Sequence, residues 1–412
     1  IAPSLVGSEM CIRDSHCSNC CSNTILRQKL PRAKMKYFHL IIITFLSTLL
    51  SQEDGESRMI SFPDIKGFKT IVCDLHTHTV FSDGSVWPNI RIQEALKDGL
   101  DAIAITEHIE YQSHKEDIPH LDRNRSYELS KKYAEKSELM VIAGTEITKS
   151  MPPGHSNAIF VKDVNKIMHD NYMDAHLAAR KQGAFIFWNH PHWIGQRKDG
   201  SVKLYEEVKD LIDKNLLHGI EVTNERTYSD QAIQVALDHN LTMLGTSDVH
   251  GFVDWDYNIP HGGHRPVTLV FSKRKNLKDL KRSLFQGRTA VWYNNLLIGK
   301  SEWIKPLLEA SIKIDSAGYY SSYELGVVKI KNVSDARFVL KNVSEYDFYQ
   351  NSDLIEIDPH STKQIAIVSG KNLSNFDLEF EVLNAVIAPS IHPTIRLRIK
   401  NVEKTQLYNV KF

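Results

Sequence analysis

Residues 71–84 have the sequence IVCDLHTHTVFSDG, and this stretch decides how the first part of the chain folds. The run from Ile71 to Leu75 is short and apolar, which predicts a buried β-strand. His76 and His78 follow two residues apart, so in extended chain both side chains point to the same side. Asp83 comes a few residues later. The stretch therefore predicts a strand that ends in a group of potential metal ligands.

Short apolar runs alternate with amphipathic segments from Thr70 to about Val291, as in successive βα units. The expected strands are Ile71–Leu75, Ala102–Thr106, Met140–Thr145, Ala184–Trp188, Gly219–Thr223 and Thr242–Gly245. Gly99 and Gly287 would follow helix ends, where glycine adopts a left-handed conformation at low cost. Six or seven such units in about 220 residues predict a closed or nearly closed parallel barrel, with an open doubly wound sheet as the alternative.

The pattern of residue types in the sequence changes past about Pro306. Short segments rich in branched residues are separated by Asn, Ser, Asp and Pro, which is typical of an all-β sandwich. The expected strands are Tyr323–Ile330, Phe338–Leu340, Leu354–Ile357, Gln364–Val368, Leu378–Leu383 and Thr394–Ile399. We therefore expect an α/β barrel domain over 62–305 and a small all-β domain over 306–412. No histidine or acid pair in the second domain looks catalytic, so we interpret it as a stabilising or docking module.

Potential metal ligands stand just past five of the expected barrel strands. In a parallel barrel these strand ends face one mouth, so the residues that follow them converge there. The nine candidates are His76, His78, Asp83, His108, Glu146, His155, His190, Asp248 and His250. So many ionisable groups at one mouth would be costly without compensation, which bound metal ions supply. Imidazole and carboxylate without thiolate suit zinc, manganese or iron(II).

In this order, the motifs resemble the PHP (polymerase and histidinol phosphatase) superfamily of metal-dependent phosphoesterases over Phe62 to Trp292. The resemblance implies a distorted (β/α)7 barrel that binds up to three divalent ions. It implies one ion on His76, His78, Glu146 and Asp248, a second on His155 and His190 with Glu146 shared, and a third on Asp83, His108 and His250. Of the two residues that the family uses at the first position of the third site, this sequence has Asp83 rather than His, which would alter the metal preference and not the mechanism.

A second, less specific similarity bears on the substrate. Segments 62–64, 86–88 and 122–127, together with the β-rich tail, are similar to a secreted bacterial subgroup that includes organophosphate diester hydrolases. This similarity favours a phosphodiester or organophosphate diester as substrate. A phosphomonoester, as in histidinol phosphatases, stays open.

The ligand set predicts hydrolysis of a phosphate ester by metal-activated hydroxide, and the resemblance implies that the site is trinuclear. Glu146, as the shared carboxylate, and Asp248 are assigned to catalysis as well as to metal binding. His264 and Arg265 follow the last expected strand, and we expect one of the basic residues there to act as general acid to the leaving group. Further candidates for substrate contacts are Arg123, Arg125, His120 and His261; residues expected to line the pocket or support the ligands are Asn189, His192, Trp193, Asn224 and Glu225.

Length, charge and cysteine content exclude several classes of protein. A chain of 412 residues is long enough for one large and one smaller domain. Lys plus Arg (50) balance Asp plus Glu (50), so no net charge draws the chain to nucleic acid. The expected partner, a small-molecule phosphate ester, follows from the ligand set and the resemblance. Of the 19 histidines, 15 lie between His76 and His264. Four of the five cysteines precede Met35 and only Cys73 lies in the main body, which excludes a disulfide framework and a cysteine-ligated zinc site there.

The N-terminal region has the pattern of a signal peptide over 35–51. After Met35 a single lysine precedes the mostly apolar run Tyr37–Leu50, and a polar stretch follows. The run is shorter than the roughly 20 residues that a membrane-spanning helix needs, so we expect export to the periplasm or medium of a bacterium and no anchor after cleavage. Residues 1–34 lack periodicity, and we interpret them as a non-native leader.

Two alternatives belong to other classes of function. An amidohydrolase-like C–N hydrolase would share the His-x-His pair and a late Asp, but it normally uses a lysine on a middle strand, and none stands at a suitable strand end. A non-enzymatic protein that uses metals only for structure would have little reason to keep open ligands at a barrel mouth. Metal-dependent ester hydrolysis is therefore the favoured interpretation.

Overall fold

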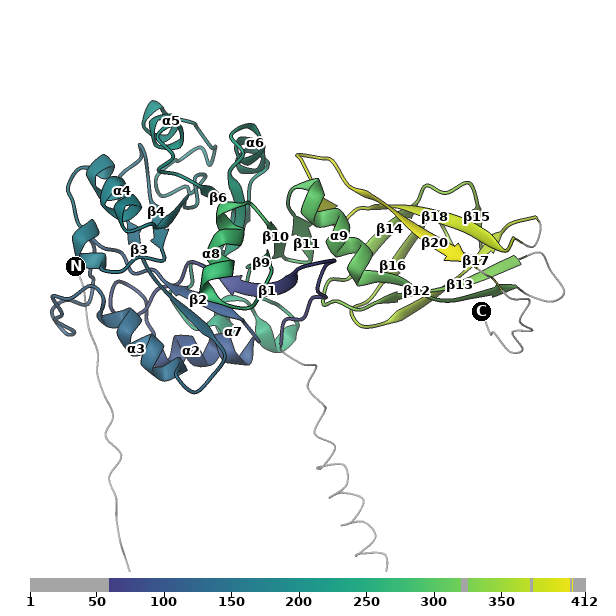
Figure 1. The fold of residues 1–412 in the computed structure, drawn as a ribbon, viewed down its shortest axis with the longest axis horizontal. Coiled ribbons are helices and arrows are strands. Elements are labelled where there is room, and N and C mark those ends of the chain that lie inside the picture. The colour runs from purple at the N-terminus through teal and green to yellow at the C-terminus, as the bar shows by residue number, and fades with distance from the viewer. Residues whose placement is uncertain (1–58, 320–324, 371–372, 401, 403–412) are drawn as a thin grey trace, which may run out of the picture. The chain divides into compact units, whose positions relative to one another are not determined.

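The computed structural model describes residues 59–319, 325–370, 373–400 and 402. The expected leader (1–34) and signal peptide (35–51) lie outside these residues. No helix in the described part of the chain is long and apolar enough to cross a bilayer. The described residues form a barrel followed by a β-sandwich (Figure 1).

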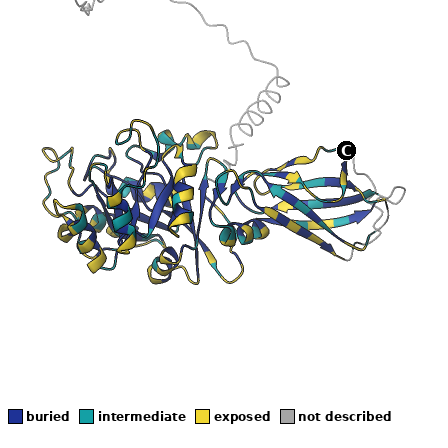
Figure 2. Ribbon diagram, turned by 90° about the horizontal axis from the view of Figure 1, so that it is seen from above, coloured by how far each residue is buried: buried dark blue, intermediate teal, exposed yellow. Residues whose placement is uncertain are grey.

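The barrel alternates strands and helices along most of its length. Its strands are β1 (Lys69–Asp74), β2 (Ala102–Ile105), β3 (Met140–Ile147), β4 (Ser156–Ile159), β5 (Phe185–Trp188), β6 (Gly219–Asn224), β7 (Thr227–Tyr228), β8 (Thr242–Thr246), β9 (Val267–Ser272), β10 (Thr289–Tyr293) and β11 (Leu296–Ile298). Its helices are α2 (Pro88–Lys97), α3 (Arg125–Ala134), α4 (Tyr172–Lys181), α5 (Glu206–Asp213), α6 (Asp230–Asp238), α7 (Val253–Asp256) and α8 (Leu277–Phe285), with short 3-10 turns at Val164–Ile167 and Ile259–His261. The strands are buried, whereas the helices expose their outer faces (Figure 2). All six expected strands are present, and Gly99 and Gly287 have positive φ past the ends of α2 and α8.

The expected distorted barrel is confirmed, but the prediction that its strands all run parallel is wrong for β4 and β9, and also for the short strands β7, antiparallel to β6, and β11, antiparallel to β10. β1, β2 and β3 are parallel to one another, as are β5, β6 and β8, whereas β4 lies antiparallel between β3 and β5. β9 is antiparallel to both β1 and β10. The connection 148–155 is shorter than the dozen or so residues that a parallel crossover needs, so β4 turns straight back. The chain from β8 to β9 stays at the mouth, so β9 starts there and runs in the opposite direction.

Threonine hydroxyls join β8 to the next strands of the ring. Thr268 Oγ1 accepts a hydrogen bond from Gly245 N at 3.0 Å and donates to Gly245 O at 2.8 Å. Thr289 Oγ1 donates to Met243 O at 2.8 Å. The hydroxyls satisfy backbone groups of β8 on the side where no backbone ladder runs, as buried peptide groups require.

An apolar core fills the barrel below its mouth. Its buried members come from β1, β2, β3, β4, β5, β8, β9 and α8; they include Ile71, Cys73, Leu75, Ala102, Ala104, Ile142, Ile159, Phe185, Phe187, Leu244, Val270 and Leu284. Burial of this much apolar surface, at about 25 cal/mol per Å², fixes the strands. The strand ends above this core are therefore held rigidly.

The C-terminal part is a sandwich of two four-stranded antiparallel sheets, which confirms the expected all-β domain. One sheet has the order β12 (Ile312–Tyr319), β13 (Leu325–Asn332), β17 (Thr362–Val368), β15 (Asp347–Tyr349), and the other β16 (Leu354–Ile357), β14 (Phe338–Asn342), β18 (Asn375–Val382), β20 (Thr394–Lys400). Pro306, where the sequence changes texture, lies inside helix α9 (Ser301–Ser311), which precedes β12.

The sandwich and the barrel share a sheet and a core. A short strand of the sandwich, β19 (Ala385–Val386), pairs in parallel with β11, so it extends the barrel sheet. Buried residues of β9, β10, β11 and α9 belong to the same apolar cluster as the sandwich interior. The two domains are therefore joined by packing as well as by the chain.

Candidate metal centre

All nine residues predicted as ligands meet at the mouth of the barrel. His76 and His78 follow β1, His108 follows β2, Glu146 ends β3, His155 precedes β4, His190 follows β5, and Asp248 and His250 follow β8, while Asp83 lies on the loop after β1. The mouth is tied together by backbone bonds: Asp248 N donates to His76 O at 2.9 Å, and His78 N donates to Val249 O at 3.2 Å.

The deepest ligand atoms belong to His76, His78, Glu146 and Asp248. The Nε2 atoms of His76 and His78 lie 3.0 Å apart, and Asp248 Oδ1 is 3.0 Å from each of them. Glu146 Oε2 is 3.6 Å from His76 Nε2 and 3.5 Å from His78 Nε2. The side chains of His76, His78 and Glu146 are fully buried. His76 and His78 thus lie close to both carboxylates, and these four residues are the ones that the resemblance assigns to one ion.

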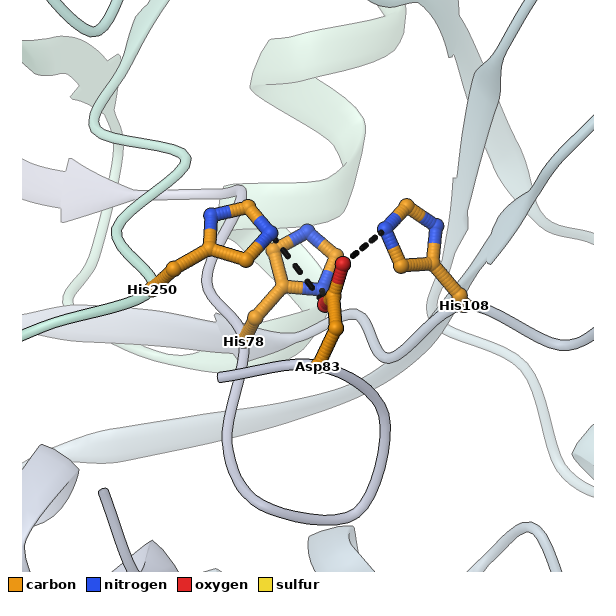
Figure 3. Close-up of side chains that lie close together, drawn as sticks. All are labelled: His78, Asp83, His108 and His250. Carbon is orange, nitrogen blue, oxygen red and sulfur yellow. Dashed lines mark ion pairs between the residues drawn. The ribbon is translucent and has the colours of Figure 1, made fainter. Parts of the chain in front are cut away.

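A second group lies nearer to the solvent and consists of His78, Asp83, His108 and His250 (Figure 3). Asp83 is central: its Oδ2 is 3.3 Å from His108 Nε2, and its Oδ1 is 3.2 Å from His250 Nε2. The ring of His78 stacks on that of His250, with centroids 4.3 Å apart. His78 thus faces this group as well as the deep one, which the expected division among three ions did not include.

A third group forms around the other oxygen of Glu146. Glu146 Oε1 is 2.8 Å from His155 Nδ1 and 3.5 Å from His190 Nε2. His108 also approaches Glu146, with its Nδ1 2.7 Å from Oε2. Glu146 therefore lies between all three groups, as expected for a carboxylate that ions share.

The nitrogen and oxygen atoms of the cluster are arranged better for binding divalent ions than for hydrogen bonding to one another. Asp83 Oδ1, Glu146 Oε2, Asp248 Oδ1 and His155 Nδ1 are buried and have no partner in hydrogen-bond geometry among the described residues. Two histidine nitrogens 3.0 Å apart share at most one proton. Ligands of a tetrahedral ion with bonds of about 2.1 Å lie about 3.4 Å apart, close to the spacing here. The lone pairs therefore converge as they would around metal ions.

The ionisation of the cluster follows from its mixture of buried acids and histidines. Burial alone would raise the pKa of Glu146, but the surrounding histidines, His108 foremost, hold it well below its usual range. Burial opposes the charge of His108, yet Glu146 and Asp83 raise its pKa to about 11. Asp83 and Asp248 raise the pKa of His250 to about 9 against the same opposition. Without ions, protons balance the carboxylates, so metal binding must release protons.

Buried side chains behind the ligands fix their orientation. Glu221 on β6 accepts from His76 Nδ1 at 2.8 Å, which leaves Nε2 of that ring free to bind an ion. Asn189 donates from Nδ2 to Glu146 Oε1 at 2.9 Å. Glu107 accepts from the hydroxyls of Thr79, Ser82 and Ser126, and two of these belong to the loop that carries Asp83.

Arg91 on α2 holds two ligand-bearing segments together. Its guanidinium donates to the carbonyl oxygens of His78 at 3.0 Å, Val249 at 3.2 Å and Gly251 at 3.0 Å. Its charge is balanced by Glu94 at 2.5 Å. The backbone is also constrained at two ligands, because His190 (φ 26°) and Asp248 (φ 50°) have positive φ, which costs of order 1–3 kcal/mol and persists where the surroundings enforce it.

Two residues predicted to act in catalysis do not join the cluster. Arg265 is fully buried and pairs with Asp74 at 3.1 Å and Asp98 at 2.6 Å, so it links β1 to the end of α2. His264 stacks on Trp292, its Nδ1 donates to Arg265 O, and its Nε2 accepts from Asn295 N. Both lie just before β9 but turn to structural partners, so neither is placed as a general acid.

The four predicted substrate contacts are spread over two loops. Arg125 is exposed and pairs with Glu128, and His261 is exposed. Arg123 is half-buried, and burial lowers its pKa. His120 packs edge-on against Phe81, two residues before Asp83, with ring centroids 4.7 Å apart. His120 thus contacts the loop that carries Asp83.

Some residues of the site were missed from the sequence. Glu221 stands inside the apolar strand β6, and a buried acid is costly unless it is paired, so its position was the available signal. Arg91 lies in a helix, where only the tertiary structure shows its three carbonyl partners. Tyr111, whose ring centroid is 6.0 Å from that of His108, carried no motif at all.

Comparisons with known proteins agree with this architecture. The Ig-like domain family DUF5001 matches residues 312–398, the sandwich. A two-domain protein from Bacteroides vulgatus, containing a predicted PHP-like metal-dependent phosphoesterase, has a crystal structure that matches with a TM-score of 0.78 at 40% identity, over 83% of this chain and 98% of that one.

Two further matches are narrower. An uncharacterised protein of Methanocaldococcus jannaschii is 40% identical over 80 residues, which are 19% of this chain and 34% of that protein, so the match spans about a third of the relative's length. PsfC from Pseudomonas syringae is 18% identical with a TM-score of 0.39, over 55% of this chain and 92% of that one, a similarity too weak to support a conclusion. On the strength of the Bacteroides match, the chain belongs to the PHP-like metal-dependent phosphoesterase family and carries an Ig-like domain at its C-terminal end.

Proposed function

We propose that this protein hydrolyses phosphate esters, with diesters favoured, at a centre of two or three divalent ions held by the nine residues at the barrel mouth. One observation carries the proposal: nine candidate ligand side chains converge there, and several of their buried atoms have no partner in hydrogen-bond geometry among the described residues. Divalent zinc, manganese or iron in such a centre makes water nucleophilic near neutral pH and neutralises charge on the phosphate.

The residues of the chain supply position and charge. Glu146 presents Oε1 and Oε2 to different histidines, and Asn189 fixes the plane of its carboxylate. Asp248 faces His76 and His78 with one oxygen. Asp83 and His250 are the most exposed of the cluster, at 23% and 35% of their side-chain surface, so the ester would enter on their side.

The test combines metal analysis with a matched pair of aryl phosphate mono- and diesters. Glu146→Gln should lower turnover by at least about 100-fold and reduce the metal content, because one oxygen of the shared carboxylate becomes an amide that cannot bind an ion. Glu206→Gln on α5, a change of the same kind at an exposed position, should leave both unchanged.

Near-normal turnover by Glu146→Gln would contradict the role of the shared carboxylate. A metal-loaded protein that hydrolyses hydantoins or lactones and no phosphate ester would replace the proposal with C–N or lactone hydrolysis. A metal-loaded protein that is inactive on every substrate of the panel would favour a structural role for the ions.

We also propose that the protein is exported, on the basis of the Met35–Ser51 pattern. Exported protein should begin just after residue 51, which mass spectrometry of the periplasmic and culture fractions would measure. Protein found only in the cytoplasm with this segment intact would contradict export.

A further inference from the structure

The candidate metal centre is partly exposed, and two aromatic side chains stand beside its histidines. The side chains of His76 and Glu146 are fully buried, whereas those of His108, His155 and His190 are each about a tenth exposed. These three rings thus belong to the partly exposed edge of the centre, together with the side chains of Asp83 and His250, which are 23% and 35% exposed.

Trp193 and Tyr111 contact these same rings. The ring centroid of Trp193 lies 5.3 Å from that of His190 and 5.9 Å from that of His155. The ring of Tyr111 lies 6.0 Å from that of His108. About half of each residue is nonetheless exposed, 46% for Trp193 and 51% for Tyr111. Each ring thus covers a ligand histidine with part of its surface and leaves the rest open.

The local structure holds Trp193 in this position. Trp193 N donates to His190 O at 2.9 Å, and Trp193 O accepts from the next turn of the same loop. Gln196 ties that turn to Lys149 O at 2.9 Å. A Cβ at Gly195 would lie 2.5 to 2.8 Å from the indole, so glycine is needed there for the ring to lie where it does. The loop backbone is therefore tied down beside His190, and Gly195 leaves room for the indole there.

Half-exposed aromatic rings beside the candidate metal centre suit a flat apolar ligand group. Aromatic pairs prefer offset or edge-to-face arrangements and contribute about 0.5–1.5 kcal/mol beyond the area that they bury. An aliphatic group of the same size would bury similar area without that contribution. Because the rings touch the ligand histidines themselves, the flat group must lie close to the phosphorus atom.

We propose that Trp193 and Tyr111 bind an aromatic ring attached to the ester oxygen directly or through one carbon, so that the centre prefers aryl and arylmethyl phosphate esters to aliphatic ones. This inference rests on the proposed phosphoesterase function and names its substrate class. It assigns the two residues to substrate specificity and not to the chemical step.

The test measures binding, so that it does not depend on turnover. Isothermal titration calorimetry of the manganese-loaded protein would compare benzylphosphonate with cyclohexylmethylphosphonate and methylphosphonate. The monomethyl esters of the three compounds give the corresponding diester analogues. The benzyl compounds should bind about 3- to 10-fold more tightly than the cyclohexylmethyl compounds, as expected for one or two aromatic contacts.

Variants assign the preference to the two rings. Trp193→Ala should bring the ratio of benzyl to cyclohexylmethyl affinity to within about twofold of unity, while Trp193→Phe retains most of it. Tyr111→Ala tests the second ring independently. Tyr133→Ala is the matched control, because Tyr133 is also 51% exposed but lies at the end of α3 that leads to the start of β3, away from the mouth. Metal content measured in parallel should be the same in all variants.

Equal affinity for benzyl and cyclohexylmethyl compounds in the wild type would overturn the inference, as would an unchanged ratio in both alanine variants. Hydrolysis of phosphate esters without a benzyl preference would reject this inference and keep the proposed function. A benzyl preference without hydrolysis of any ester would keep this inference about binding and reject the proposed function. Failure of every phosphonate to bind would overturn both.

Discussion

Glu221 is a buried carboxylate whose two oxygens accept four hydrogen bonds. Its Oε1 accepts from His76 Nδ1 and Thr246 Oγ1, and its Oε2 accepts from His190 N at 2.7 Å and Asn224 Nδ2 at 2.8 Å. A carboxylate meets this demand because it only accepts, whereas an amide would turn its NH₂ toward two donors. Glu221 thus orients two ligand residues without facing the ions itself.

Glu221→Gln should weaken metal binding by about 10- to 100-fold, the usual cost of losing a group that orients a metal-bound histidine. Competition with a fluorescent chelator would measure the affinity, and circular dichroism would confirm that the fold persists. Glu206→Gln is again the control. Unchanged affinity in Glu221→Gln would show that His76 needs no support from this carboxylate.

At the residue scale, the convergence of the nine candidate ligands could be predicted from the sequence because barrel geometry brings strand ends together whatever their separation along the chain. His264 and Arg265 could not be placed in the same way. They precede β9, a strand that runs antiparallel to β1, and their side chains turn to Trp292 and to Asp74 and Asp98. Nearness in sequence to a ligand strand does not give the direction of a side chain.

β8 is the element on which the closed mouth depends, and Gly245 is its tightest point. A Cβ at Gly245 would lie 2.2 Å from Val291 Cγ1 on β10 and 2.7 Å from Thr223 Oγ1 on β6. The absence of a side chain therefore allows β8 to approach both neighbours and Thr268 to bridge its backbone.

Gly245→Ala should destabilise the protein by about 1–3 kcal/mol through overpacking. Val291→Ala removes the closest atom, so the double variant should be less destabilised than the sum of the two changes by about 1 kcal/mol. Chemical denaturation measures both the loss of stability in Gly245→Ala and its coupling to Val291→Ala. Val328→Ala, a buried valine of the sandwich, should add to Gly245→Ala without coupling. Additivity in the Val291 pair would contradict the packing argument.

At the element scale, the parallel strands were recognisable because each is a short apolar run followed by a helical pattern. β4 was not, because SNAI carries little apolar signal and no helix separates it from β3. The pairing of β19 with β11 could not be predicted either. Two short strands about 90 residues apart along the chain meet only because the sandwich packs on the barrel.

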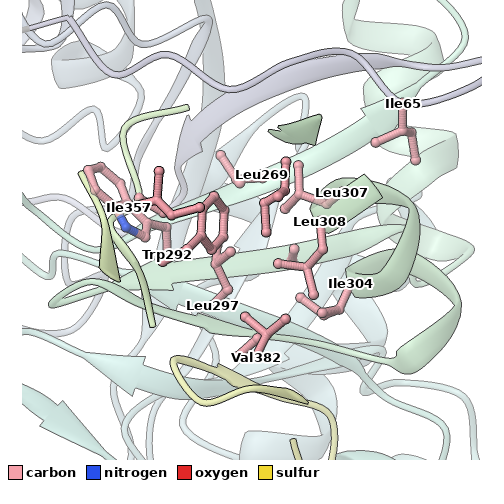
Figure 4. Packing of buried hydrophobic residues seen from close by; sticks show 14 of the residues in the cluster. Ile65, Leu269, Trp292, Leu297, Ile304, Leu307, Leu308, Ile357 and Val382 are labelled. Carbon is pink, nitrogen blue, oxygen red and sulfur yellow. The ribbon is translucent and has the colours of Figure 1, made fainter. Parts of the chain in front are cut away.

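The whole molecule is joined through one apolar cluster that runs from the barrel into the sandwich. Figure 4 shows Trp292 and Leu297 of the barrel sheet beside Leu307 and Leu308 of α9 and Val382 of the sandwich. Leu297 is fully buried, and its backbone N donates to Asn384 O at 2.9 Å. Interfaces this apolar resemble the interior of a domain, so we expect the barrel and the sandwich to unfold together.

Tryptophan fluorescence can test this coupling, because all six tryptophans lie in the barrel or in α9. Leu378→Ala, a fully buried leucine on β18 of the sandwich, should cost about 2–5 kcal/mol. If the domains unfold as one unit, the fluorescence transition should shift by as much as the far-UV circular dichroism transition, although no tryptophan lies in the sandwich. Leu297→Ala, which weakens the interface itself, should then separate the two transitions. A fluorescence midpoint that stays at the wild-type value in Leu378→Ala would show that the barrel folds independently of the sandwich. The sandwich would then be needed for something other than the stability of the barrel.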